Sequence, residues 1–169
     1  MRNFIILTFL VLISQSKAYA CSILNVDIGT SVSAASEKFD FLETFDASAY
    51  GDDFSVRFNV PAKDYCEDSN LESADLEVIV YNSQIVGINI LSWDPNIKNE
   101  VYDFTNNFVG SLGSDLKKDK VGLKDLSLGN LLIIYSKYEH QEQIHELLEI
   151  TNNQLSNYTV GEQILDANG

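Results

Sequence analysis

The sequence predicts an α+β domain in which a mainly antiparallel sheet of about five strands has about three helices packed on it. Apolar and polar residues alternate over residues 54–60, the period of a half-buried strand. Two apolar runs at 76–80 and 86–90 flank a short polar turn, which favours a hairpin. Helical spacing of apolar residues follows capping residues at positions 31 and 94. Because three predicted strands follow one another, the sheet should be mainly antiparallel.

The chain segment 24–28 alternates Leu24, Val26 and Ile28 with polar residues, and this predicts a strand that Gly29 ends. Thr30 or Ser31 can then cap a helix that continues toward residue 45. Its inward face would carry Val32, Ala35 and Phe39.

The middle of the chain gives the strongest strand pattern, over residues 54–60, and Pro61 should stop that strand. Residues 76–80 and 86–90 are expected to pair around a turn at 82–84. Both of these strands also carry apolar residues on their second face. The pair is therefore predicted to lie in the centre of the sheet, covered at least partly on both sides.

The last third of the chain predicts helix, strand and helix. Asp94-Pro95 is a typical helix start, and Gly113 should end that helix before a polar loop that reaches Gly129. Its inward stripe would be Val101, Phe104, Thr105, Phe108 and Leu112. Residues 131–135 form a continuous apolar run, interpreted as a buried strand. Residues 136–139 fit a capping box that would begin a final helix. Its inward face would carry Ile144, Leu147, Leu148 and Thr151.

Residues 1–20 have the three parts of a secretory signal peptide. A basic start at Arg2 precedes an apolar run over 4–13, and small residues at Ala18 and Ala20 suit cleavage. The apolar run is about half of the roughly 20 residues that a membrane-spanning helix needs. We therefore expect an exported chain, secreted or periplasmic, whose single globular domain covers 21–169 and has no membrane span.

The charge of the chain is strongly negative, with 11 basic and 25 acidic residues and a net charge of -14. Removal of Arg2 and Lys17 with the signal leaves 9 basic against 25 acidic residues, a net charge of -16. Such a surface repels nucleic acid and anionic membranes, because both require basic patches. It attracts a protein partner with a basic surface. The alternative is that the acids only keep an exported protein soluble.

The two cysteines, Cys21 and Cys66, are expected to form a disulfide, because export places them in an oxidising compartment. The bridge would close a loop of about 45 residues and contribute roughly 4 kcal/mol. Bacterial lipidation of Cys21 is the alternative, although the bulky Tyr19 fits such a signal poorly. Two cysteines cannot by themselves supply a metal site, and no cofactor motif is present, so we predict neither metal nor cofactor.

The two histidines, His140 and His145, are the main catalytic candidates. Their spacing of five does not match the zinc-protease pattern, in which the histidines are four apart and Glu follows the first. Neither a nucleophile elbow nor a phosphate-binding glycine loop is present. The sequence therefore favours a protein that is not an enzyme. A small exported hydrolase using His140 or His145 stays as the alternative.

Two acidic loops that each contain a tyrosine are the candidate binding surface. Tyrosine is a typical interface anchor, and neighbouring carboxylates favour a basic partner. The residues are Tyr50, Asp52 and Asp53 in one loop, and Tyr65, Glu67 and Asp68 in the other. We therefore expect an exported, non-enzymatic binding protein, such as an inhibitor or immunity protein for a basic envelope or secreted protein. A structural accessory protein of the cell envelope is a further alternative.

Overall fold

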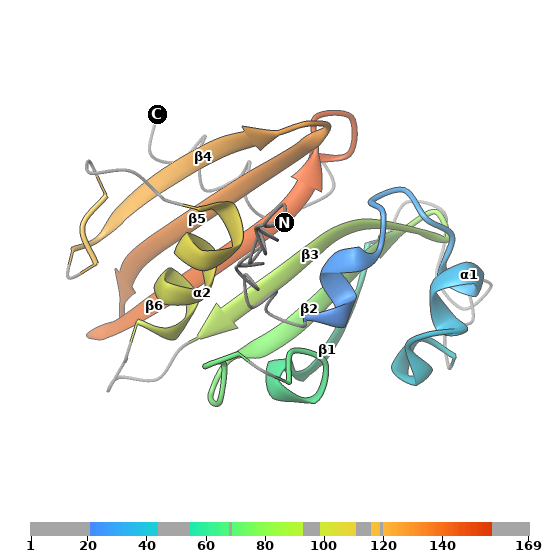
Figure 1. Cartoon of the computed structure of the whole chain (residues 1–169), viewed down its shortest axis with the longest axis horizontal. Coiled ribbons are helices and arrows are strands. Elements are labelled where there is room, and N and C mark those ends of the chain that lie inside the picture. The colour runs from blue at the N-terminus through green and yellow to red at the C-terminus, as the bar shows by residue number, and fades with distance from the viewer. Residues whose placement is uncertain are drawn as a thin grey trace, which may run out of the picture.

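The computed structural model describes residues 21–43, 55–67, 69–92, 99–110, 116–118 and 120–156. Its described strands form one six-stranded sheet in the order β1-β2-β3-β6-β5-β4 (Figure 1), and every neighbouring pair is antiparallel. The strands are β1 (Val56–Pro61), β2 (Asp75–Tyr81), β3 (Gln84–Ser92), β4 (Gly122–Leu128), β5 (Leu131–His140) and β6 (Gln143–Asn152). The predicted antiparallel α+β class is confirmed, but the described sheet has one strand more than expected.

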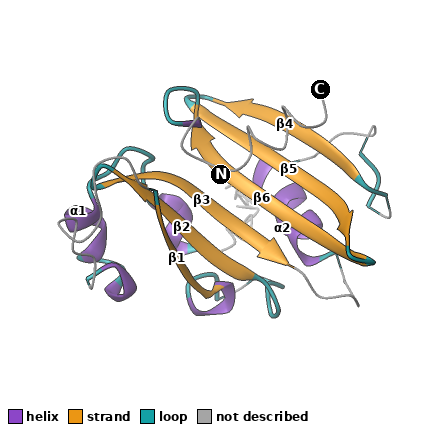
Figure 2. Ribbon diagram, turned by 180° about the vertical axis from the view of Figure 1, so that it is seen from behind, coloured by secondary structure: helices purple, strands orange, loops and turns teal. Residues whose placement is uncertain are grey.

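The described helices all lie on one side of the sheet, which we call the helix face (Figure 2). They are the α-helices α1 (Val32–Ser36) and α2 (Glu100–Val109), and the short 3-10 helices η1 (Ser22–Asn25), η2 (Asp40–Leu42) and η4 (Ala62–Asp64). The prediction of about three helices was therefore imprecise, since the described part has two α-helices and several single turns of 3-10 helix.

The predicted central hairpin is confirmed. Strands β2 and β3 are joined by Asn82 and Ser83, both with positive φ, and β3 pairs with β6 on its other side. Such backbone angles suit a two-residue turn whose twist matches that of the strands. Both faces of β2 and β3 are buried over most of their length, so their near-continuous apolar sequences are accounted for.

The final helix predicted from residue 136 was wrong. Residues 136–140 continue β5, and residues 143–152 form β6, which lies between β3 and β5. The turn between them, Gln141-Glu142, has positive φ at both positions without Gly or Asn. The apolar spacing of residues 144–151 resembled that of a helix, because a strand buried on both faces contains apolar residues at many spacings, including three and four.

Two further expectations fail at the edges of the core. Residues 22–25 form η1 and not a strand, and Leu24, Val26 and Ile28 are packed against the core from the helix layer. The polar loop expected between 113 and 129 contains edge strand β4. One charged pair, Lys124-Asp125, hid the strand pattern in β4.

The helix caps follow the sequence only in part. Ser31 caps α1 as predicted, since its hydroxyl accepts a hydrogen bond from the Ala34 backbone N–H. The helix is much shorter than expected, because it ends at Ser36 and the chain then turns into η2. Helix α2 begins after Asn99 and ends before Gly110, which adopts φ +83°. The predicted boundary residues Asp94, Pro95 and Gly113 lie outside the described residues.

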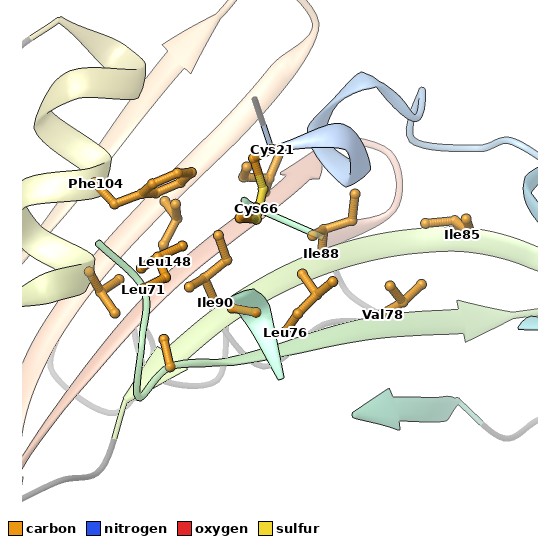
Figure 3. Close-up of a cluster of buried hydrophobic side chains, with 14 of the residues drawn as sticks. Cys21, Cys66, Leu71, Leu76, Val78, Ile85, Ile88, Ile90, Phe104 and Leu148 are labelled. Atoms are coloured by element: carbon orange, nitrogen blue, oxygen red, sulfur yellow. A yellow bond between two sulfur atoms is a disulfide. The ribbon is translucent and has the colours of Figure 1, made fainter. Parts of the chain in front are cut away.

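The core fills the space between the helix face and the helices. Its buried side chains include Leu76 of β2, Ile90 of β3, Phe104 of α2 and Leu148 of β6. Figure 3 shows the Cys21–Cys66 disulfide among these side chains. The predicted disulfide is thus present, and both cysteines are buried.

Within the described ranges, no helix is long and apolar enough to cross a membrane. The signal peptide predicted for residues 1–20 lies outside the described residues.

Candidate functional site

The predicted binding residues fall partly within the described structure. Tyr65 and Glu67 are described, whereas Tyr50, Asp52, Asp53 and Asp68 lie outside the described residues. The site is therefore built around Tyr65, at the end of η4 and next to Cys66.

The Tyr65 side chain packs in a cluster of three aromatic rings. Its ring centroid lies 4.9 Å from that of Phe41 and 5.9 Å from that of Phe39, both in edge-on geometry. Its hydroxyl donates a hydrogen bond to Oδ1 of Asp40 at 2.8 Å. The ring is therefore packed against two neighbouring rings and fixed at its polar tip, which restricts its rotamer.

The backbone at Tyr65 is also fixed. The backbone N–H and the hydroxyl of Ser22 both donate to the Tyr65 carbonyl, at 2.9 and 3.1 Å. The neighbouring Cys66 is bridged to Cys21, directly before Ser22. The disulfide and these hydrogen bonds connect the start of the described chain to the end of η4. They restrain the backbone that carries Tyr65.

Three acidic residues lie near this tyrosine, Asp40 through its hydrogen bond and Asp64 and Glu67 along the chain. Asp40, Asp64 and Glu67 are all exposed, and Phe41 is half-buried. Burial, the hydrogen bond to Asp40 and the negative charges of Asp40 and Asp64 together raise the pKa of Tyr65 to about 12. The phenol therefore stays protonated and remains a donor at neutral pH. We call these five residues, Asp40, Phe41, Asp64, Tyr65 and Glu67, the Tyr65 patch.

Sequence reasoning missed Asp40 and Phe41 as members of this site. It placed them on the helix expected to continue from Ser31, whereas the chain forms a separate 3-10 turn at Asp40–Leu42. The sequence Phe39-Asp40-Phe41-Leu42, in which one acid stands among three large apolar residues, was a local signal for an aromatic site. It could not reveal that Tyr65, 25 residues along the chain from Asp40, completes the cluster.

A buried polar cluster lies at the opposite end of the helix layer, beneath α2. The Tyr135 hydroxyl donates to Oε1 of Glu146 at 2.6 Å, and Lys137 Nζ lies 3.7 Å from the same oxygen. Lys137 also donates to Oδ1 of Asn99 and, at 2.7 Å, to the carbonyl of Lys118. Burial and the negative Glu146 raise the pKa of Tyr135. This cluster joins β5, β6, α2 and the segment before β4, so its role is structural.

A second polar group crosses the sheet face opposite the helices. Arg57 Nη1 and Asn89 Nδ2 both donate to Oε2 of Glu77, at 2.7 and 2.8 Å. Glu149 lies beside Asn89 in the strand register and is fully buried. These contacts link β1, β2 and β3 through side chains, in addition to the backbone ladder.

The two histidines lie in the β5–β6 hairpin and not on a helix, so the helical geometry expected for them was wrong. The His145 ring stacks on Tyr138 at 5.2 Å and meets His140 edge-on at 5.9 Å. The rings therefore form an aromatic cluster near the hairpin turn. The hydrolase hypothesis for these residues stays a prediction.

Two hollows flank the start of β4. One has a volume of about 390 Å³ and is lined by residues that include Leu123, Ser136 and Tyr138. The other has a volume of about 290 Å³ and is lined in part by Lys117 and Lys120. Among the described residues, no group of three or more His, Cys, Asp or Glu side chains is placed to hold a metal ion.

Comparison with protein-family models, with characterised proteins and with solved structures gives no match to this chain. The fold and site define it as a disulfide-bridged, antiparallel α+β protein with an acid-rimmed aromatic patch.

Proposed function

We propose that this chain is an exported, non-enzymatic binding protein that captures a protein with a basic surface through the Tyr65 patch. The observation that carries the proposal is the fixed Tyr65 ring, packed against Phe41 and hydrogen-bonded to Asp40 at 2.8 Å, among exposed carboxylates. An inhibitor or an immunity protein is the kind of protein that such a surface suits.

The patch combines the features of an interface centre. Aromatic anchors supply much of the binding energy when a partner covers them, and a ring already held in place loses little rotamer freedom. The carboxylates of Asp64 and Glu67 are exposed and lie within two residues of Tyr65 in the chain, where they can meet Lys or Arg side chains of the partner. The phenol of Tyr65 keeps its hydrogen bond to Asp40 when water is excluded.

The overall charge favours the same kind of partner. A net charge of -14 attracts a basic protein over distances longer than direct contact, and it raises the rate of encounter at low salt. The disulfide supports the proposal of export, since paired cysteines persist in oxidising compartments.

The proposal is tested by capture with matched variants. The immobilised chain should retain one partner from extracts of its own source after a high-salt wash. Tyr65→Ala and the double variant Asp64→Asn/Glu67→Gln should each lose that partner. The matched controls are Tyr138→Ala and Glu139→Gln/Glu142→Gln, which change one tyrosine and remove two negative charges at the far β5–β6 hairpin, where these side chains are exposed. Equal retention by the patch variants and their controls would contradict the proposal.

A further inference from the structure

Strands β1 and β4 are the two outer strands of the described sheet. Strand order places them at opposite edges. An outer strand presents backbone N–H and C=O groups along one side and can pair with another extended chain. Proteins use such edges for strand addition, in which the backbone supplies affinity and the side chains supply specificity.

The directions of the strands allow one copy to continue the sheet of the next. Because all neighbouring pairs are antiparallel, strand direction alternates across the six strands, and β4 runs opposite to β1. A second copy placed side by side in the same orientation would therefore bring its β1 antiparallel to β4 of the first. The helices of both copies would then lie on the same side of the extended sheet.

The side chains of the two edges form two apolar pairs in one register. With Asn59 opposite Asp125, all six residues of β1 pair with residues 123–128 of β4. On the helix face this register places Val56 against Leu128 and Phe58 against Leu126. Leu128 is 51 % exposed, so this contact would cover one of the larger exposed apolar side chains of the described part. Apolar cross-strand pairs of this kind stabilise antiparallel sheets.

The other face of the same register is polar and complementary. Asn59 lies opposite Asp125, to which its amide can donate, and Arg57 lies opposite Ser127, diagonal to Asp125. Arg57 is exposed and already bonded to Glu77, so its guanidinium has further donors for a second carboxylate. A diagonal neighbour is within the reach of a long side chain.

The segments that flank the two strands also have opposite charge. Exposed Asp64 follows the end of β1, while exposed Lys117 and Lys120 precede the start of β4. In the antiparallel register these ends come together, since Pro61 lies opposite Leu123. Attraction between them would favour this alignment over one with the strands reversed.

Pairing of β4 with its own copy is less favourable. In an antiparallel pair of identical strands, the register that overlaps all seven residues of β4 places Asp125 opposite Asp125. Like charges directly opposite each other destabilise a strand pair. The edges of this chain therefore favour unlike partners, β1 with β4.

We propose that copies of this chain associate head to tail, with β1 of one copy adding to β4 of the next. The interface is heterologous, so each complex still presents one outer β1 and one outer β4 of its described sheets, and association continues unless the ends meet in a ring. The right-handed strand twist would make a long assembly helical.

Disulfide trapping tests this pairing directly. Two tagged forms of the chain, Asn59→Cys and Asp125→Cys, are mixed and mildly oxidised. We expect a mixed disulfide dimer that contains both tags. The control mixes Asn59→Cys with Lys124→Cys, which lies next to Asp125 but on the opposite face of β4, and here the dimer should be lost. Equal cross-linking in both mixtures, or none in either, would overturn the proposal. Dimers formed by Asn59→Cys alone or Asp125→Cys alone to the same extent as in the mixture would overturn it as well, because they indicate pairing of like strands.

Light scattering of the unmodified chain gives an independent test. The average mass should grow with concentration beyond that of a dimer, and Leu128→Glu should abolish the growth. The control Val121→Glu changes a residue that is 58 % exposed on the same edge but outside the paired segment, and it should leave the growth unchanged. A constant monomer mass, or a mass that levels off at the dimer, would contradict the open assembly.

The Tyr65→Ala variant should still form the mixed disulfide between Asn59→Cys and Asp125→Cys. Failure of the proposed partner binding can therefore be distinguished from failure of self-association.

Discussion

The ammonium group of Lys137 and the carboxylate of Glu146 lie 3.7 Å apart across β5 and β6, with side chains only 6 % and 0 % exposed. Both ions also have neutral partners, Asn99 and the Lys118 carbonyl for Lys137 and the Tyr135 hydroxyl for Glu146. A buried pair supported in this way fixes the position of α2 on the sheet, whatever its net contribution to stability.

Removal of one ion should be strongly destabilising. Lys137→Met leaves the Glu146 charge buried without its counter-ion, and we expect a loss of roughly 3 to 5 kcal/mol in the free energy of unfolding. Urea denaturation measures this loss. Lys63→Met, at an exposed lysine, is the control and should change stability little. The double variant Lys137→Met/Glu146→Gln should recover part of the loss. A Lys137→Met protein as stable as the Lys63→Met protein would show that the pair is not buried.

Loss of the Tyr135 hydroxyl should have a smaller effect. Tyr135→Phe keeps the ring but removes the hydrogen bond to Glu146 at 2.6 Å, so one carboxylate oxygen loses its donor. We expect a cost of about 1 to 3 kcal/mol, measured by urea denaturation. Because Tyr135 and Lys137 share Glu146, their effects should not be additive in a double-mutant cycle. Strict additivity would contradict the shared contact.

The disulfide should stabilise the chain through its long loop. The cysteines are 45 residues apart, and the chain-entropy model gives about 4 kcal/mol for a loop of this length. Cys21→Ala/Cys66→Ala should lower the free energy of unfolding by about that amount, and it should also loosen Tyr65. Amide hydrogen exchange at Ser22, whose N–H is bonded to the Tyr65 carbonyl, reports the loosening. Unchanged protection of the Ser22 amide in the double variant would show that the disulfide does not help to hold Tyr65 in place.

Ionisation of Tyr65 should make stability depend on alkaline pH. Its pKa is raised from 10.0 to about 12 in the folded chain, so the unfolded chain loses this proton first. The stabilising contribution is complete below pH 10 and is lost as the pH rises toward 12. Tyr65→Phe should therefore show a shallower alkaline decline in the free energy of unfolding. Asp40→Asn should lower the pKa of Tyr65, measured by the ultraviolet absorbance of phenolate as a difference from Tyr65→Phe. An unchanged pKa in Asp40→Asn would show that the hydrogen bond contributes nothing to the shift.

The parts of the fold with a single buried face or a clear turn could be predicted from the sequence. Strand β1 alternates apolar and polar residues from Val56 to Val60, and its burial alternates in the same way. The hairpin of β2 and β3 was recognisable from two short apolar runs around Asn82-Ser83. Cap Ser31 and the inward stripe of α2 also have direct local signals.

Strand β6 could not be predicted because its pattern depends on neighbours far along the chain. Its Leu and Glu residues suit a helix locally, but both faces are buried between β3 and β5. Two acids of this strand are buried: Glu146 is bonded to Tyr135, and Glu149 lies beside Asn89 in the register. The turn at Gln141-Glu142 lacks Gly, Asn and Asp, so the usual hairpin signal was missing.

Only those residues of the candidate site that have a local sequence signal could be predicted. Tyr65 and Glu67 stood out as an aromatic residue and an acid beside a cysteine. The contribution of Asp40 and Phe41 depends on how η2 packs against η4, which only the three-dimensional structure provides.

The association rate of the captured partner with the chain, measured as a function of salt concentration, tests binding at the Tyr65 patch most directly. We expect the rate for the unmodified chain to fall steeply as salt is added. Asp64→Asn/Glu67→Gln should slow association and flatten this dependence, while Glu139→Gln/Glu142→Gln should behave like the unmodified chain apart from the small effect of its reduced net charge. Identical rates and salt dependences for the two double variants would contradict a binding site at the Tyr65 patch.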